Sequence, residues 1–283
     1  MNYKFKTIKF ELKDNGIGIL SLNRPDDLNS MSLQLIEDLH EILDHLMNNL
    51  DCRVLILRAE GRVFCAGLDL KEMPLISKKK LPEEFRKYSH MNVSEVVKRQ
   101  MYYQYRISNA LKKMRKIPQP IIALIQGAAT GGGFALTLAA DIRIASQEAK
   151  FNNAFIKIGL SGSDVGTSYF LPRLIGMSRA IEILYTGRFF NSSEAEKIGF
   201  LLEIVEKDKL FERALELASE FLTKSPLGLR MTKEAINLSM NAPSIETLTE
   251  LENRAQIICG TSKDAVEGGQ AFFSKREPKY PLR

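Results

Sequence analysis

The run Gln126-Gly127-Ala128-Ala129-Thr130-Gly131-Gly132-Gly133 is the feature that most limits how this chain can fold. It follows the apolar run 121–125 and precedes an apolar helical pattern. Glycine adopts backbone conformations that are closed to other residues, and a helix that begins there has N–H groups without partners. Those N–H groups and the helix dipole favour a negative charge. The run therefore predicts a strand-to-helix loop that binds an anion or oxyanion, the alternative being a tight turn that binds nothing.

A second glycine-containing loop strengthens the first interpretation. The segment Arg62-Val63-Phe64-Cys65-Ala66-Gly67-Leu68-Asp69-Leu70 follows the apolar run 54–57, just as the glycine triplet follows its own apolar run. Two units of this kind can direct two backbone amides at one atom.

The alternation of elements indicates an α/β protein. The chain has 283 residues, of which 45% are hydrophobic and 26% charged, as expected of one compact unit. Short apolar runs bounded by Gly, Asn and Asp alternate with helical patterns. Strands are predicted over 16–22, 51–58 and 120–126, and an amphipathic helix over 32–47. Its apolar face comprises Leu35, Ile36, Leu39, Ile42, Leu43 and Leu46.

Two further regions stand out. The lysine-rich segment 74–82 is the candidate for a mobile lid, and a long helical pattern follows it through Met114. After Lys207 the pattern is wholly helical, with breaks at Ser225-Pro226 and Ala242-Pro243, which predicts a C-terminal helical layer.

Charge and cysteine content exclude some classes of protein. The net charge of +6 is mild, and most basic residues are expected on solvated faces. The three scattered cysteines fit a reduced compartment better than a disulfide framework. We expect no membrane span and no signal peptide, and therefore a cytoplasmic protein. Nucleic-acid binding is not expected, because aromatic and basic residues form no regular stacking platform.

Several ordered motifs resemble those of one family. Leu22-Asn23-Arg24-Pro25 and Leu28-Asn29-Ser30-Met31 precede the two glycine loops, and Ala140-Asp141-Ile142-Arg143-Ile144-Ala145 follows them. Together they resemble the crotonase (enoyl-CoA hydratase/isomerase) superfamily over nearly the whole chain. The resemblance implies a spiral of ββα units over 1–205 and a C-terminal all-helical oligomerisation region over 206–283. It also implies a homotrimer or a hexamer built as a dimer of trimers.

The resemblance implies an acyl-CoA thioester as the substrate, so coenzyme A enters with the substrate and no separate cofactor is expected. By motif position, the amides of Leu68 and Gly132 would bind the thioester oxyanion. The backbone at Ala66 and Leu70 would bind the adenine. The residues expected near the CoA phosphates are Lys275, Arg276 and Arg24, although Asp26 stands where the family often has a lysine.

The expected chemistry departs from that of hydratases in the family. Their two glutamates correspond to Ala135 and Phe155, which cannot transfer a proton and leave an apolar acyl pocket. Asp164 falls where dienoyl-CoA isomerases and ring-cleaving members carry an aspartate, and Gln104 is a candidate to orient water or substrate beside it. The alternative is that Asp164 only caps the following helix.

Three functions remain open at this stage. We favour an isomerase or a ring-opening or carbon–carbon hydrolase that uses Asp164. A true hydratase with atypical acids, or a non-catalytic protein that binds CoA esters or RNA, are the alternatives. A metal site is not expected, because His40 and His45 are five residues apart and do not stack on one helix face.

Overall fold

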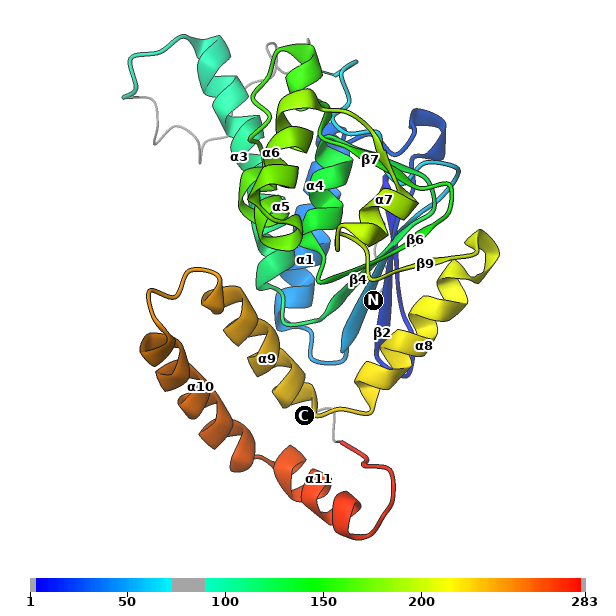
Figure 1. Ribbon diagram of the computed structural model, residues 1–283, viewed down its shortest axis with the longest axis vertical. Coiled ribbons are helices and arrows are strands. Elements are labelled where there is room, and N and C mark those ends of the chain that lie inside the picture. The colour runs from blue at the N-terminus through cyan, green and yellow to red at the C-terminus, as the bar shows by residue number, and fades with distance from the viewer. Residues whose placement is uncertain (1–3, 73–89, 281–283) are drawn as a thin grey trace.

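The computed structural model describes residues 4–72 and 90–280 and shows two β-sheets surrounded by helices (Figure 1). The candidate lid at 74–82 lies outside the described residues. The larger sheet has six strands, of which the first two pair antiparallel and the rest parallel. Their order is β1 (Ile8–Leu12), β2 (Ile17–Leu22), β3 (Val54–Ala59), β4 (Ile121–Ile125), β6 (Ile142–Ser146) and β9 (Glu203–Val205).

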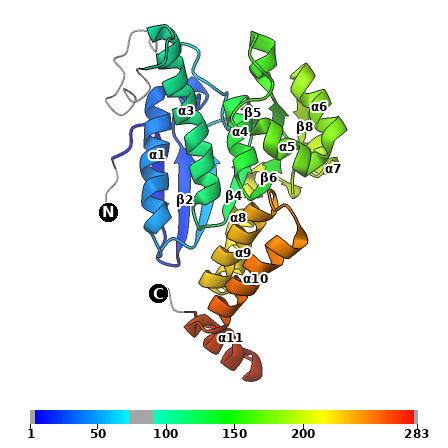
Figure 2. The ribbon, with the colours of Figure 1, turned by 90° about the vertical axis from the view of Figure 1, so that its left-hand side faces the viewer.

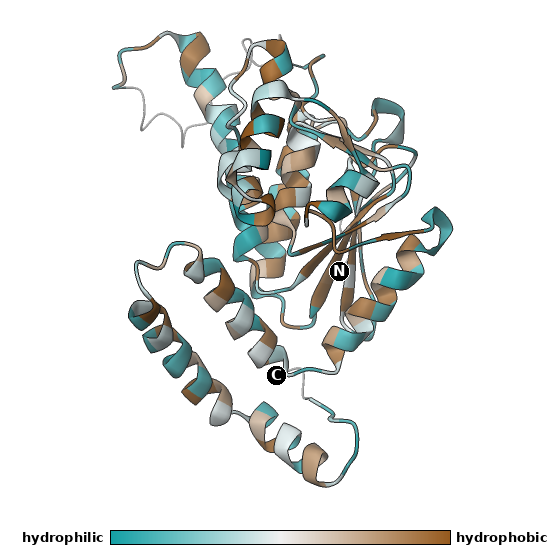
Figure 3. Cartoon of the chain, in the orientation of Figure 1, coloured by the Kyte–Doolittle hydropathy of each residue, from teal (hydrophilic) through white to brown (hydrophobic). Residues whose placement is uncertain are grey.

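The central strands β2, β3 and β4 are apolar except for Ser21 and Arg58, as expected where both faces of a sheet are buried. Alternate residues such as Ile19 and Ile56 pack against α8 (Leu210–Leu222) on one face. Their neighbours, such as Leu20 and Leu55, pack on the other face, in the main core that includes α1. Figure 3 shows the resulting hydrophobic interior.

Helix α1 (Leu33–Asn48) confirms the amphipathic helix that the sequence predicts. The Ser32 hydroxyl caps it by accepting from the Leu35 N–H. All six residues of the predicted apolar face are buried. The helix lies beside α3 (Glu95–Lys116), and Figure 2 shows both in front of the larger sheet.

The smaller sheet explains the repeated strand-strand-helix pattern. It contains β5 (Ala128–Thr130), β7 (Lys150–Asn152) and β8 (Phe190–Asn191). From β4 the chain passes into β5 and then α4 (Gly132–Ala139), and from β6 it passes into β7 and then α5 (Thr167–Ile175). Between β7 and α5 lies the short helix η3 (Ala154–Ile158), whereas α6 (Met177–Thr186) and α7 (Ser192–Lys197) flank β8.

The C-terminal helices extend away from the sheets (Figures 1 and 2). These are α9 (Pro226–Ser239), α10 (Ile245–Gly260) and α11 (Lys263–Phe273), which we call the C-terminal arm. The buried Lys233 of α9 donates to the Gln119 carbonyl at 2.6 Å and pairs with Asp141 at 2.9 Å. The breaks before α9 and α10 agree with the sequence, and the domain boundary at residue 206 stays a prediction. Among the described helices none is both long and apolar enough to cross a bilayer.

Candidate active site

The two glycine loops meet because their backbones approach closely. A Cβ atom added to Gly133 would lie 2.2 Å from the Cys65 carbonyl oxygen, so only glycine allows this approach. Gly67 has a φ of +92°, and a Cβ there would lie 2.9 Å from the Thr130 carbonyl oxygen. The Thr130 hydroxyl also donates to the Ala66 carbonyl at 2.7 Å. The glycines therefore hold the loop after β3 against the start of α4.

This contact places the amides of Leu68 and Gly132 side by side. A Cβ added to Gly67 would lie 3.5 Å from the Gly132 nitrogen, and one added to Gly132 would lie 3.8 Å from the Leu68 nitrogen. Met31 pairs with the Leu68 segment through its own N–H and carbonyl, which leaves the Leu68 N–H unused. Neither amide donates to a carbonyl within the described part of the chain. Two free N–H groups therefore stand next to each other, as an oxyanion requires.

Both amides border a cavity of about 490 Å³. Apolar side chains from α1, α3, η3 and the two loops form most of its lining, and among the described residues Asp164 is its single carboxyl group. The lining also includes the polar residues Gln100, Tyr103, Gln104 and Tyr105, all from α3. No group of three or more His, Cys, Asp or Glu residues suited to a metal occurs within the described ranges.

Asp164 and Gln104 are brought together across this cavity. The Gln104 side-chain amide and the Val165 N–H both donate to Oδ1 of Asp164, the latter at 2.7 Å. Oδ2 accepts no hydrogen bond from any described residue. Burial raises the pKa of Asp164 above its ordinary value, and the bonds from Val165 and Gln104 partly oppose that rise. A carboxyl group with a raised pKa and one free oxygen is suited to accept and return a proton.

The loop that carries Asp164 is strained, and Asp164 does not cap α5. Val165 has a φ of +42°, which is unfavourable for a β-branched residue. Helix α5 has Gly166 at its N-cap without a side-chain cap hydrogen bond, so the capping interpretation of Asp164 is wrong. The Asp164 N–H instead donates to the Thr167 hydroxyl at 3.2 Å. Strain of this kind often marks a functional position.

The other predicted site residues divide into two groups. Ala66, Leu70 and Phe155 line the cavity together with Leu68 and Gly132, and the Phe155 ring would lie 3.4 Å from a Cβ at Gly131. Ala135 is buried in α4 and is not among the residues that line the cavity. The position that bears one hydratase glutamate therefore contributes no side chain to the cavity here.

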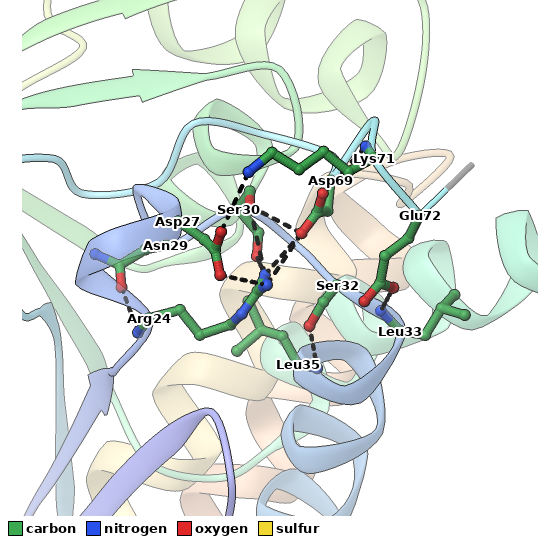
Figure 4. Close-up of polar contacts among 10 residues, drawn as sticks. All are labelled: Arg24, Asp27, Asn29, Ser30, Ser32, Leu33, Leu35, Asp69, Lys71 and Glu72. Carbon is green, nitrogen blue, oxygen red and sulfur yellow. Dashed lines mark hydrogen bonds and ion pairs between the residues drawn. The ribbon is translucent and has the colours of Figure 1, made fainter. Parts of the chain in front are cut away.

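The structure does not bring the three predicted phosphate ligands to the cavity. The Arg24 guanidinium pairs with Asp69 at 3.0 Å and Asp27 at 2.9 Å (Figure 4). Lys275 and Arg276 follow α11 at the far end of the arm, where Arg276 pairs with Glu267 at 2.7 Å. Within one chain these tail residues cannot reach a ligand at the glycine loops, because the arm extends away from them.

Sequence reasoning missed Met31, which also lines the cavity. Met31 belongs to a motif that the sequence showed, but only the structure reveals that it pairs with Leu68. The Met31 sulfur would lie 2.6 Å from a Cβ at Gly132. The sequence offered a tyrosine of the 95–114 helix as an alternative to Gln104, and the structure places Tyr103 and Tyr105 of α3 in the lining of the cavity.

The two sheets, the paired glycine loops and the apolar cavity define an α/β protein of the crotonase fold. The family model for enoyl-CoA hydratase/isomerase matches residues 12–282, and the chain belongs to that family. It is 35% identical over 263 residues, 93% of this chain and 85% of the relative, to a Mycobacterium leprae protein described as a probable enoyl-CoA hydratase. It is 33% identical to 1,2-epoxyphenylacetyl-CoA isomerase of Escherichia coli, over 94% of this chain and 95% of the relative.

The fold agrees with solved structures of the same family. The crystal structure of an enoyl-CoA hydratase from Bacillus anthracis superposes with a TM-score of 0.86 and 33% identity. The similarity covers 98% of this chain and all of that one.

Proposed function

We propose that this protein isomerises an acyl-CoA thioester by moving a proton through Asp164. The observation that carries the proposal is a cavity lined by Leu68 and Gly132, whose amides have no described backbone partner, together with a single described carboxyl group. Hydration of a conjugated double bond needs a base and an acid on the same face, whereas one carboxyl group can remove a proton and return it elsewhere. The relative named as an isomerase supports the same reaction class.

The thioester oxygen would accept hydrogen bonds from the Leu68 and Gly132 amides. Such preorganised donors are worth roughly 3 kcal/mol each when negative charge develops on the oxygen. Ionised Asp164 would take a proton from a carbon atom conjugated with the thioester, forming an enolate, and protonated Asp164 would return it to another carbon. Gln104 would hold the carboxyl group in place through its bond to Oδ1.

A panel of enoyl-, dienoyl- and oxoacyl-CoA substrates, with products followed by mass, tests this proposal. Isomerisation leaves the mass in ordinary water unchanged, and in heavy water the product gains deuterium only to the extent that the proton on Asp164 exchanges with solvent before it is returned. A product heavier by one water would instead identify a hydratase or a ring-opening hydrolase. Absence of turnover with every ester, together with tight binding of CoA esters, would identify a non-catalytic binding protein and contradict the proposal.

We propose further that the enzyme assembles as a homotrimer or hexamer in the cytoplasm. The arm exposes large apolar side chains that a single chain leaves uncovered, among them Ile257, Phe272 and Phe273. In such an assembly Lys275 would approach the CoA phosphates of a neighbouring subunit. Arg276 has a partner in Glu267 and would have to exchange it for a phosphate.

A further inference from the structure

We infer that Arg24 and Asp69 form a positioning pair that aims the Leu68 amide at the thioester oxygen. The inference rests on the proposed oxyanion site and assigns Arg24 a role other than phosphate binding. Figure 4 shows the Arg24 side chain directed at Asp69, with Ser30 beside both.

Both terminal nitrogens of the Arg24 guanidinium are hydrogen-bonded to the protein. Its Nη1 donates to the Ser30 carbonyl at 2.6 Å and to Oδ2 of Asp69 at 3.1 Å, and Nη2 reaches the same oxygen at 3.0 Å. Nη2 also donates to Asp27 at 2.9 Å. The Asp69 side chain is only 6% exposed, so its charge depends on Arg24 for compensation. A phosphate could take the guanidinium only by leaving that buried carboxylate without its cation.

Asp69 follows Leu68 directly, so a fixed Asp69 restricts the peptide that carries the Leu68 N–H. Oδ2 of Asp69 also accepts from the Ser30 hydroxyl at 3.3 Å, and Oδ1 accepts from the Lys71 N–H at 3.2 Å. The Asp69 N–H donates to the Met31 carbonyl at 3.2 Å, and the Met31 N–H donates to the Gly67 carbonyl at 2.7 Å. Both sequence neighbours of Leu68, Gly67 and Asp69, are therefore hydrogen-bonded to Met31.

The segment 28–31, which ends at Met31, has an unusual backbone conformation. Leu28 and Asn29 both have positive φ values, of 55° and 53°. The fully buried Asn29 side chain accepts from the Arg24 N–H at 2.8 Å and donates to the carbonyls of Glu60 and Val63. Arg24 thus contacts the segment 28–31 through its backbone N–H and contacts Asp69, next to Leu68, through its side chain. Removing the Arg24–Asp69 pair would free the loop to move away from Gly132.

The test compares Arg24→Gln and Asp69→Asn in the full-length protein. A displaced oxyanion donor should lower kcat roughly 10-fold or more in each variant. The double variant should lose little more than either single one, because both changes break the same contact. Arg213→Gln removes another arginine–carboxylate pair, with Glu203, that is remote from the cavity, and this control should retain wild-type kcat.

Infrared spectroscopy of bound butyryl-CoA, labelled with ¹³C at its carbonyl carbon, separates the possible roles. This saturated probe needs no turnover, so it reports on the folded, ligand-bound fraction of each variant. The wild-type protein and Asp164→Asn should lower the carbonyl frequency equally, whereas Arg24→Gln and Asp69→Asn should return it toward that of the free ester. A wild-type frequency in both pair variants would overturn the positioning role.

Two other results would also overturn it, each for a different reason. Weaker binding of free CoA by Arg24→Gln but not by Asp69→Asn would show that Arg24 binds phosphate. An unshifted carbonyl frequency in the wild-type protein would show that the proposed oxyanion site itself is wrong.

Discussion

At the scale of single residues, the proposed chemistry depends on how burial and hydrogen bonding change the pKa of Asp164. Burial favours its neutral form, while the donors Val165 and Gln104 favour the ionised form. Burial is the larger effect, so the pKa of Asp164 is raised. The carboxyl group can then exist in both forms during one catalytic cycle, as a proton shuttle must.

The pH dependence of activity tests this balance. A base that works as a carboxylate loses activity as the pH falls through its pKa, so the acid limb of kcat/KM should lie above the ordinary aspartate value of 3.8. Gln104→Leu removes a hydrogen bond that lowers the pKa of Asp164, so its acid limb should move to higher pH. A profile identical to that of the wild-type protein would show that Gln104 does not contact the working carboxylate.

The raised pKa of Asp164 should also make the free energy of unfolding depend on pH. A carboxyl group with a higher pKa in the folded state binds more protons when folded, so its contribution to stability falls as the pH rises. Asp164→Asn carries no such charge. Its free energy of unfolding relative to wild type should therefore increase as the pH rises from below 3.8 toward neutrality. Urea unfolding across this range measures the difference, and a decrease would contradict the assigned direction.

At the residue level, motif position indicated which side chains lie near each other, but not what they do. The placement of Asp164 beside Gln104 in one cavity agrees with what the sequence suggested, although their roles stay predictions. Arg24 could not be placed, because its partner Asp69 lies 45 residues away and no local pattern indicates which of several acids an arginine will meet. The same limit hid the supporting role of Met31.

At the scale of elements, the decisive contact is between α4 and the loop after β3. The central strands β2, β3 and β4 of the larger sheet were predicted because their apolar runs are long enough to identify. The strands β5, β7 and β8 were not predicted individually, since they have only two or three residues and depend on pairing with distant segments. The glycines reveal a close approach, but only the structure shows which backbone approaches.

Replacing Gly133 by alanine tests that contact. The new Cβ would lie 2.2 Å from the Cys65 carbonyl oxygen and 2.8 Å from its carbon, so backbone must move. We expect a loss of at least about 2 kcal/mol in the free energy of unfolding and a large loss of activity. Gly269→Ala is the matched control, because its Cβ meets nothing within 4 Å and α11 should gain up to about 1 kcal/mol. Equal stabilities for both variants would contradict the close approach.

At the scale of the whole molecule, the C-terminal arm is the part whose large apolar side chains are left exposed in a single chain. The helical pattern after Lys207 predicted its helices correctly. What sequence did not show is that α8 packs on the larger sheet, so that α9, α10 and α11 alone extend from it. Periodicity identifies an apolar face but not what covers it.

Subunit assembly should depend on that arm. Ile257→Asp places a charge on an apolar position that is 67% exposed in the single chain, and it should shift the protein to smaller species. Leu202→Asp is the matched control on the sheet-containing part, at 56% exposure, and should retain the wild-type assembly. Analytical ultracentrifugation at several concentrations measures both. A monomeric wild-type protein would refute the proposed oligomer.

Asp164→Asn tests the central claim most directly, with turnover and CoA-ester affinity measured on the same preparation. The account predicts that the rate falls on the order of 10³-fold, while the dissociation constant for the substrate ester stays within about twofold of wild type. This split is expected because the Leu68 and Gly132 amides and the apolar cavity remain intact. A variant that retains the wild-type rate would contradict the account.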